Sequence, residues 1–246
     1  MDTASTVALS RLTAQQRALD VTATNIANAG TPGFQAGRVL FSDWLSRQGG
    51  TDSPPGGGVV AYTQDRATYR DRQPGALQHT ANPFDLALGG EGYFTVETKA
   101  GTRLTRAGRF SPQADGTVGD AEGNALLDTG GRPLRLSPAD TRITVSADGT
   151  VSSENGQIGR IAVVKPADPY RVQAEGSRLL RADTPTEPVA APRMVQGAVE
   201  DSNVQPVVET TRMMALLREF QFATQFVQGE ADRQQKAIDK LTQRRG

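Results

Sequence analysis

Apolar residues recur at helical spacing near the two ends of this 246-residue chain and not between them. Near the N-terminus, the positions three and four residues apart are Leu9, Leu12, Gln16, Leu19, Ala23 and Ile26. Near the C-terminus they are Met213, Leu217, Phe220, Thr224, Val227, Ala231, Gln234, Ile238 and Leu241. This spacing is typical of helices that pack along a coiled-coil seam. We therefore expect two terminal helices that form a coiled-coil-like pair, with the rest of the chain inserted between them.

Both predicted helices need packing partners. The N-terminal stripe has Gln and Ala at two of its positions, and a helix with so thin an apolar stripe is marginal alone in water. The C-terminal helix carries Phe222 and Phe226 on a second face. A second apolar face favours contact with more than one partner, although a wide stripe facing one core would also explain it.

The N-terminal helix is predicted to end within T-N-I-A-N-A-G-T-P-G-F, which begins at Thr24. Gly30 suits the left-handed position after a helix, and Pro32 cannot continue one. Asn25 and Asn28 lie on one face just before this break. Two interpretations are open. Either these asparagines cap the last helical carbonyl groups, or their amides bond to packed neighbours and set register.

Short β-forming segments and turns replace the helical pattern between residues 62 and 197. The clearest segments are F-D-L-A-L (84–88), Y-F-T-V-E-T (93–98), R-I-T-V-S (142–146) and I-A-V-V (161–164). Asp-Gly pairs at 115–116 and 148–149 mark hairpin turns. This block predicts an antiparallel β domain that is sandwich-like or barrel-like.

The chain is therefore predicted to be an α+β protein with four parts. They are an N-terminal helix (1–33), an extended or flexible linker (34–61), a central β domain (62–197) and a C-terminal helix (198–246). The linker is inferred from R-Q-G-G-T-D-S-P-P-G-G-G-V at residues 47–59, which is rich in Gly and Pro.

Composition argues against catalysis, cofactors and nucleic acid. Lys plus Arg and Asp plus Glu both number 27, so no broad basic surface for nucleic acid is expected. The absence of Cys excludes disulfides and thiolate metal sites, and the single histidine, His79, cannot form a histidine-based metal cluster. Neither a nucleophile elbow nor a phosphate-binding loop occurs. We expect no enzyme activity, no metal and no cofactor.

The sequence also lacks the usual signals for membranes and for secretion. No run of apolar residues is long enough to span a bilayer. The N-terminus has neither a basic start nor an apolar core, so we do not expect a Sec-type signal peptide. The protein is then either cytoplasmic or exported by another route.

Both ends and the middle of the chain resemble the flagellar axial-protein family, which includes rod and hook subunits. The N-terminal signature of that family, Asn-x-Ala-Asn followed by Thr-x-Gly and an aromatic, is matched by Asn25, Ala27, Asn28, Thr31, Gly33 and Phe34. The C-terminal motif is matched by Glu200, Ser202, Asn203, Val204, Met213, Met214, Arg218 and Phe220. G-A-L-Q-H-T-A-N-P-F-D-L-A-L-G-G-E-G-Y-F-T-V, which ends at Val96, resembles the β domain that hook and rod subunits share. Within the family, the short length and T-P-G-F are more similar to proximal-rod subunits.

The resemblance implies a structural subunit of the flagellar rod in the periplasm, which self-assembles through its terminal helices into a torque-transmitting tube. It implies export by the flagellar type III apparatus without a cleaved signal peptide, and contacts with other axial proteins and with copies of itself, near peptidoglycan. The implied assembly residues are Leu12, Leu19, Asn25, Ile26, Asn28, Thr31, Gly33, Phe34, Ser202, Asn203, Val204, Met213, Leu217, Arg218, Phe220 and Val227. The alternatives are a distal-rod or hook-type subunit, or a periplasmic protein that binds or hydrolyses cell-wall glycan.

Overall fold

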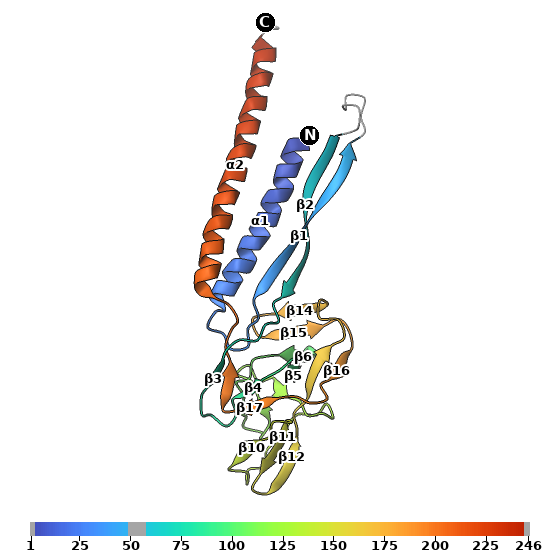
Figure 1. Cartoon of the computed structure of the whole chain (residues 1–246), viewed down its shortest axis with the longest axis vertical. Helices are drawn as coiled ribbons and strands as arrows, with labels where there is room; N and C mark the ends of the chain where they lie inside the picture. Colours follow the sequence, from blue (N-terminus) through green and yellow to red (C-terminus); the bar gives the residue numbers. More distant parts are fainter. Residues whose placement is uncertain (1–2, 49–57, 244–246) are drawn as a thin grey trace. The chain divides into compact units, whose positions relative to one another are not determined.

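The computed structural model describes residues 3–48 and 58–243, and it has the predicted α+β fold (Figure 1). The chain forms two compact units. The helical unit comprises Met1–Ile26, Gly37–Tyr69 and Gln205–Gly246. The β unit comprises Ala27–Ala36 and Arg70–Val204.

The longest elements lie near the two ends of the chain, and short strands lie between them. The helices are α1 (Thr3–Ala27) and α2 (Pro206–Gln243). The strands are β1 (Gly37–Gln48), β2 (Gly58–Arg70), β3 (Leu77–His79), β4 (Leu86–Leu88), β5 (Tyr93–Thr98), β6 (Gly101–Thr105), β7 (Ser111–Pro112), β8 (Val118–Gly119), β9 (Ala125–Leu126), β10 (Ile143–Val145), β11 (Thr150–Ser153), β12 (Gly156–Arg160), β13 (Val163–Pro166), β14 (Val172–Glu175), β15 (Leu179–Ala182), β16 (Thr186–Pro188), β17 (Met194–Gln196) and β18 (Ala198–Glu200).

In the helical unit, α1 buries a face of small and polar side chains. The buried residues of this face are Ala14, Gln15, Ala18, Thr22 and Asn25. Small side chains let a neighbouring backbone approach closely, and the Thr22 hydroxyl meets its own hydrogen-bonding need by donating to the Ala18 carbonyl at 2.8 Å. The buried face of α1 therefore relies on close approach and polar contacts and contains no large apolar side chain.

The apolar stripe predicted as the packing seam of α1 is not its buried face. Leu9 is 63% exposed, and Gln16 and Ala23 are also exposed. The remaining members of the stripe, Leu12, Leu19 and Ile26, are half-buried. This stripe thus keeps apolar surface that the helical unit does not cover.

α2 shows the same separation between its inner and outer faces. Glu209, near its start, is 1% exposed. The half-buried residues that continue this face along the helix are Met213, Leu216, Phe220, Thr224 and Val227. Leu217 is 43% exposed, although its spacing had placed it in the predicted seam. Phe222 and Phe226, on the second apolar face, are 73% and 58% exposed.

A two-stranded sheet replaces much of the predicted linker. β1 and β2 pair with each other and cover residues 37–48 and 58–61 of the segment 34–61. The segment predicted as an extended or flexible linker is therefore extended at these positions and pairs as two strands. The Gly- and Pro-rich composition that suggested a linker belongs mainly to residues 49–57, which lie outside the described residues.

The break after α1 consists of two successive turns, as the cluster of Asn, Gly and Pro predicts. The Thr31 amide donates to the Asn28 carbonyl at 3.1 Å, and the Phe34 amide donates to the Thr31 carbonyl at 3.2 Å. The residue with left-handed backbone is Gly33, with φ of 72°, and the assignment of this role to Gly30 is wrong. The helix ends in turns of ordinary φ, and the sharper reversal comes three residues later.

The β unit is antiparallel, as predicted, and its largest sheet has nine strands. The main path of this sheet runs β14-β15-β6-β5-β9-β8-β7, and β13 joins it through β5. It is open at β14 and β7, so the described strands form no closed sheet and the barrel-like alternative is not supported. β10, β11 and β12 form a second sheet, while β17 pairs with β4 and β18 pairs with β3.

Sequence signals for strands and turns correspond closely to this unit. β5 has the predicted bounds, and left-handed glycines follow both predicted Asp residues, Gly116 at φ of 81° and Gly149 at φ of 87°. Tyr93, Phe94 and Phe110 are buried, and the rings of Phe94 and Phe110 meet edge to face at 5.5 Å. These aromatics belong to the core, so they offer no exposed platform for a glycan.

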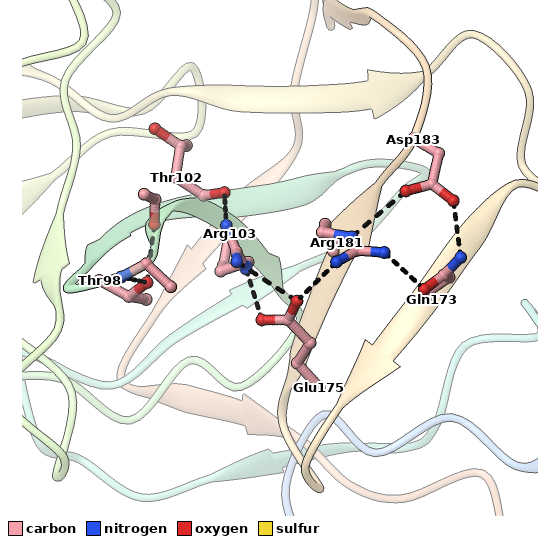
Figure 2. A network of polar contacts seen from close by, with 9 residues as sticks. Thr98, Thr102, Arg103, Gln173, Glu175, Arg181 and Asp183 are labelled. Atoms are coloured by element: carbon pink, nitrogen blue, oxygen red, sulfur yellow. Dashed lines mark hydrogen bonds and ion pairs between the residues drawn. The ribbon is translucent and has the colours of Figure 1, made fainter.

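A polar ladder crosses the end of the large sheet at β14, β15 and β6 (Figure 2). Arg103 on β6 donates to both carboxylate oxygens of Glu175 on β14, at 2.6 and 3.3 Å. Arg181 on β15 approaches the same carboxylate from the other side, with its Nη1 3.6 Å from Glu175 Oε1, and it also donates to Gln173 and Asp183. These hydrogen bonds hold the pKa of Glu175 below its usual value, chiefly through Arg103. Charged side chains at an edge strand oppose pairing with another sheet.

Candidate assembly site

Residues from the N-terminal break and from the segment before α2 meet in the β unit. The Gly33 amide donates to the Glu200 carbonyl at 2.7 Å, and the Asn203 amide donates to the Phe34 carbonyl at 3.3 Å. These bonds join positions about 170 residues apart in the sequence. The two segments that resemble the axial-protein family therefore form one structural element.

A small apolar cluster fills this junction. Phe34, Ala36 and Val204 are 2%, 0% and 6% exposed, and Ala29 packs against them. The guanidinium of Arg70 lies 4.9 Å from the centre of the Phe34 ring and donates to the Gln35 carbonyl at 2.6 Å. Cation–π contact and hydrogen bonding thus close the cluster over Phe34.

Asn203 links three backbone groups of the junction. Its side-chain oxygen accepts from the Ala36 amide at 2.7 Å. Its side-chain nitrogen donates to the carbonyls of Asp71 and Gln73, at 2.9 and 2.8 Å. Only an amide offers both an acceptor and two donors here, so the residue type follows from the geometry.

Gly33 is required by both its conformation and its surroundings. Its φ of 72° is a conformation that favours glycine. A Cβ at this position would lie 2.3 Å from the Ala107 nitrogen and 2.3 Å from the Arg106 carbonyl carbon. These are backbone atoms, which cannot move aside as a side chain could. Any other residue would therefore force the backbone to shift at this point.

The side chain of Glu200, whose carbonyl accepts from Gly33, forms a buried ion pair with Arg106. Arg106 and Glu200 are 4% and 2% exposed, and Arg106 Nε lies 3.4 Å from Glu200 Oε2. The two atoms are within ion-pair distance but do not form a hydrogen bond, so the attraction between them is electrostatic. Each side chain has a further backbone partner, since Glu200 accepts from the Gly75 amide and Arg106 donates to the Gly90 carbonyl. Burial raises the pKa of Glu200, and the charge of Arg106 opposes that shift.

In the helical unit, Asn25 joins α1 to both β1 and α2. Its side-chain oxygen accepts from the Gly37 amide at 2.8 Å, and its nitrogen donates to the Gly37 carbonyl at 3.0 Å and to Glu209 Oε2 at 3.1 Å. Arg38 donates to the other carboxylate oxygen of Glu209 at 2.5 Å. Asn25 and Glu209 are each 1% exposed. Of the two interpretations for Asn25, the geometry supports bonding to packed neighbours.

Three family models match successive parts of the chain. The model described as "Flagella basal body rod protein" matches residues 6–35. "Flagellar hook protein FlgE/F/G D1 domain" matches residues 87–153, and "Flagellar basal body rod FlgEFG protein C-terminal" matches residues 195–240. The two terminal matches include the segments that meet at the junction described above.

Full-length relatives decide the family. The flagellar basal-body rod protein FlgF of Mesorhizobium japonicum is 37% identical, with 96% of both chains covered. FlgF of Caulobacter vibrioides is 33% identical, with 98% of both chains covered. The chain belongs to the flagellar basal-body rod protein family. FlgG of Bacillus subtilis, another member, is 31% identical over 84% of this chain and 86% of its own.

Residues implied by the family resemblance fall into two groups. Gly33, Phe34, Asn203 and Val204 make contacts inside the β unit, where they hold the two ends of the chain together. Nearby, the Thr31 hydroxyl donates to the Asn28 side chain at 3.1 Å, and the Ser202 hydroxyl accepts from the Val204 amide at 3.3 Å. Asn28 therefore takes part in the turn that ends α1, in contrast to Asn25.

The second group lies on the helices and keeps accessible surface. Leu12, Leu19, Ile26, Met213, Phe220 and Val227 are half-buried, and Leu217 and Arg218 are exposed. Because the chain belongs to a basal-body rod family, we expect this surface of its helices to take part in contacts between subunits. Those contacts remain a prediction.

The sequence analysis did not identify several residues that stabilise the junction in the β unit and the contacts of Asn25 in the helical unit. In the helical unit these are Gln15, Gly37, Arg38, Glu209 and Glu219, and in the β unit they are Arg70 and Arg106. Glu209 lies in the first turn of α2, where acidic residues are common, so its burial has no distinctive sequence signal. The partners of the arginines are distant in sequence and follow only from the fold.

No helix in the described part of the chain is long and apolar enough to cross a membrane.

Proposed function

We propose that this chain is a structural subunit of the proximal rod of the bacterial flagellum, assembling through its terminal helices into the axial tube that transmits torque. Its relatives named FlgF, similar over nearly their whole length, support this reading. The observation that carries it is the exposed apolar surface of the helical unit. Val207, Phe222 and Phe226 on α2 and Leu9 on α1 are each more than half exposed. A soluble protein covers such surface by binding partners.

The proposal includes details that follow from this role. α1 and α2 form a coiled-coil-like pair, and Leu12, Leu19, Ile26, Leu217 and Phe220 contribute to contacts within the pair and with neighbouring subunits. The subunit reaches the periplasm through the flagellar type III export apparatus, without a cleaved signal peptide, and lies near peptidoglycan. The role is structural and needs neither catalysis nor a cofactor. The similarity to FlgG proteins is compatible with a distal-rod position as the alternative.

The test uses a strain from which the gene has been deleted. The unaltered gene should restore swimming. Phe222→Asp places a charge on the exposed apolar face of α2, and a charge that becomes buried without a partner costs several kcal/mol. We expect this variant to be exported but depleted at least about tenfold from isolated basal bodies, since each 1.4 kcal/mol is a factor of ten.

Tyr170→Asp is the matched control, because Tyr170 is 70% exposed but lies in the β unit. It should assemble and swim as the parent does. Failure of the unaltered gene to restore swimming would overturn the proposed function. Normal incorporation of Phe222→Asp would instead show that this face of α2 is not an interface.

A further inference from the structure

Two polar contacts join α1 to α2, and both have the same alignment. Asn25 Nδ2 donates to Glu209 Oε2 at 3.1 Å, and Gln15 Nε2 donates to Glu219 Oε2 at 3.2 Å. Gln15 precedes Asn25 by ten residues, and Glu219 follows Glu209 by ten. Ten helical residues span about 15 Å. Both contacts are therefore satisfied together in one antiparallel register of the helices.

The apolar residues of the helical unit do little to choose that register. The buried face of α1 offers Ala14 and Ala18 as its apolar members, and its large apolar residues lie elsewhere. Sliding α2 by one heptad would set Ala223 opposite Ala18 in place of Leu216, a smaller contact that is still apolar. A weakly specified seam of this kind admits alternative alignments unless polar groups exclude them.

The contact between Asn25 and Glu209 supplies such an exclusion. Both side chains are 1% exposed, so a different register that kept Glu209 buried would leave its carboxylate without the Asn25 amide. Arg38 holds the second carboxylate oxygen, and the Gly37 backbone occupies the rest of the Asn25 amide. The position of Glu209 is thereby fixed with respect to both α1 and the start of β1.

We propose that Asn25 and Glu209 are the register-determining residues of the helical unit, and that they select the single alignment of α1 with α2. A buried polar pair is costly compared with apolar packing, and fixing register is the best-attested reason for such a pair. The consequence rests on the proposed function. The alignment decides where the apolar stripes of α1 and α2 stand relative to each other when they meet neighbouring subunits.

The chain has no cysteine, so pairs of introduced cysteines report the register directly. Ala18→Cys with Leu216→Cys reports the native alignment, and Ala18→Cys with Ala223→Cys reports a slip of one heptad. A short bifunctional thiol reagent is applied to the full-length protein. In the otherwise unaltered chain, we expect the native pair to be cross-linked at least about tenfold more than the slipped pair, as for a register favoured by about 1.4 kcal/mol.

Asn25→Asp is the decisive variant because it keeps the size of the side chain and replaces the donor nitrogen by a second carboxylate oxygen. Two buried carboxylates then face each other, so the native cross-link should fall and the slipped one should rise. Adding Glu209→Gln returns a donor and an acceptor to the pair in exchanged positions, so the native cross-link should recover in part, while the Gly37 carbonyl still lacks the donor that Asn25 supplied. Gln16→Glu makes the corresponding change from amide to carboxylate on the exposed face of α1 and should leave the ratio unaltered.

Three results would overturn the proposal. They are a cross-link ratio unchanged by Asn25→Asp, no recovery when Glu209→Gln is added, and equal or absent cross-linking of both reporters in the unaltered chain. None of these depends on flagellar assembly. The outcome is therefore independent of whether the gene restores swimming.

Discussion

Thirteen buried apolar side chains form a single core in the β unit, whereas the described part of the helical unit buries two alanines and a set of polar side chains. Exposed apolar side chains show the opposite distribution between the two units. Among the described residues, ten of the twelve large apolar side chains that are exposed belong to the helical unit, and only Leu77 and Tyr170 belong to the β unit. The β unit thus buries its apolar side chains in a core, whereas the helical unit leaves many of its large apolar side chains exposed.

This difference separates stability from assembly within one chain. A continuous apolar core supplies most of the free energy of folding, so the β unit contains what it needs to be stable. Helices whose apolar faces are exposed depend on partners for their own stability. The helical unit instead uses hydrogen bonds from Asn25 and Gln15 to join its elements. Such bonds specify geometry well but contribute little net free energy each.

The largest expected effect comes from equal truncations in the two units. Phe94→Ala removes a ring that is 0% exposed and packs against Phe110 at 5.5 Å. Loss of a core Phe costs about 3–5 kcal/mol of unfolding free energy. Phe222→Ala removes a ring that is 73% exposed and should change it by less than about 0.5 kcal/mol. Urea denaturation of the purified chain, followed by far-ultraviolet circular dichroism, measures both. Equal effects would contradict the contrast between the units.

A second pair of variants tests the junction within the β unit. Gly33 and Gly131 have nearly the same left-handed φ, 72° and 73°, but a Cβ on Gly131 would meet no atom within 4 Å. Gly131→Ala should therefore cost only the left-handed strain of about 1–2 kcal/mol. Gly33→Ala adds overlap with the backbone of Arg106 and Ala107, and overpacking typically costs about 1–3 kcal/mol more. The same denaturation measurement compares the two. If their costs were equal, the close passage at Gly33 would have no energetic importance.

Local sequence signals predicted much of the fold. The end of α1 near Ala27 and the bounds of β5 follow from spacing and turn chemistry that act over a few residues, whereas α2 begins at Pro206, later than the predicted boundary at residue 198. The Asp-Gly hairpins are predictable for the same reason, because glycine accepts the positive φ that the turn requires. Family motifs at both ends indicated that residues such as Asn25 and Asn203 matter.

What escaped prediction depends on groups that meet only in three dimensions. The apolar stripe of α1 suggested a buried face, but the helical unit buries the neighbouring face with Ala18 and Asn25. The partners of Glu209 and Asn203 lie more than 100 residues away in sequence, and no local pattern encodes them. β1 and β2 were missed because Gly and Pro in the segment between them dominated the composition.

The smallest expected effect concerns a surface contribution to the β unit. The carboxylate of Glu154, after β11, accepts from the Thr141 amide at 2.8 Å, the Thr141 hydroxyl at 2.7 Å and the Arg142 amide at 3.1 Å. These bonds lower the pKa of Glu154 to about 2, with the Thr141 amide as the largest cause. A carboxyl whose pKa is lower in the folded state stabilises that state above its unfolded pKa of about 4.3.

Acid should therefore remove this contribution as the pH falls from about 4.5 towards 2. Glu154→Gln cannot titrate, so it should be slightly less stable than the parent at pH 6, and the difference should shrink steadily as the pH falls towards 2. Thr141→Val removes the hydroxyl bond and keeps the amide bond, so its curve should lie between the other two. Urea midpoints at pH 6, 4, 3 and 2 measure all three proteins. Three parallel curves would mean that these hydrogen bonds add nothing to the β unit, and that the apolar core alone distinguishes it from the helical unit.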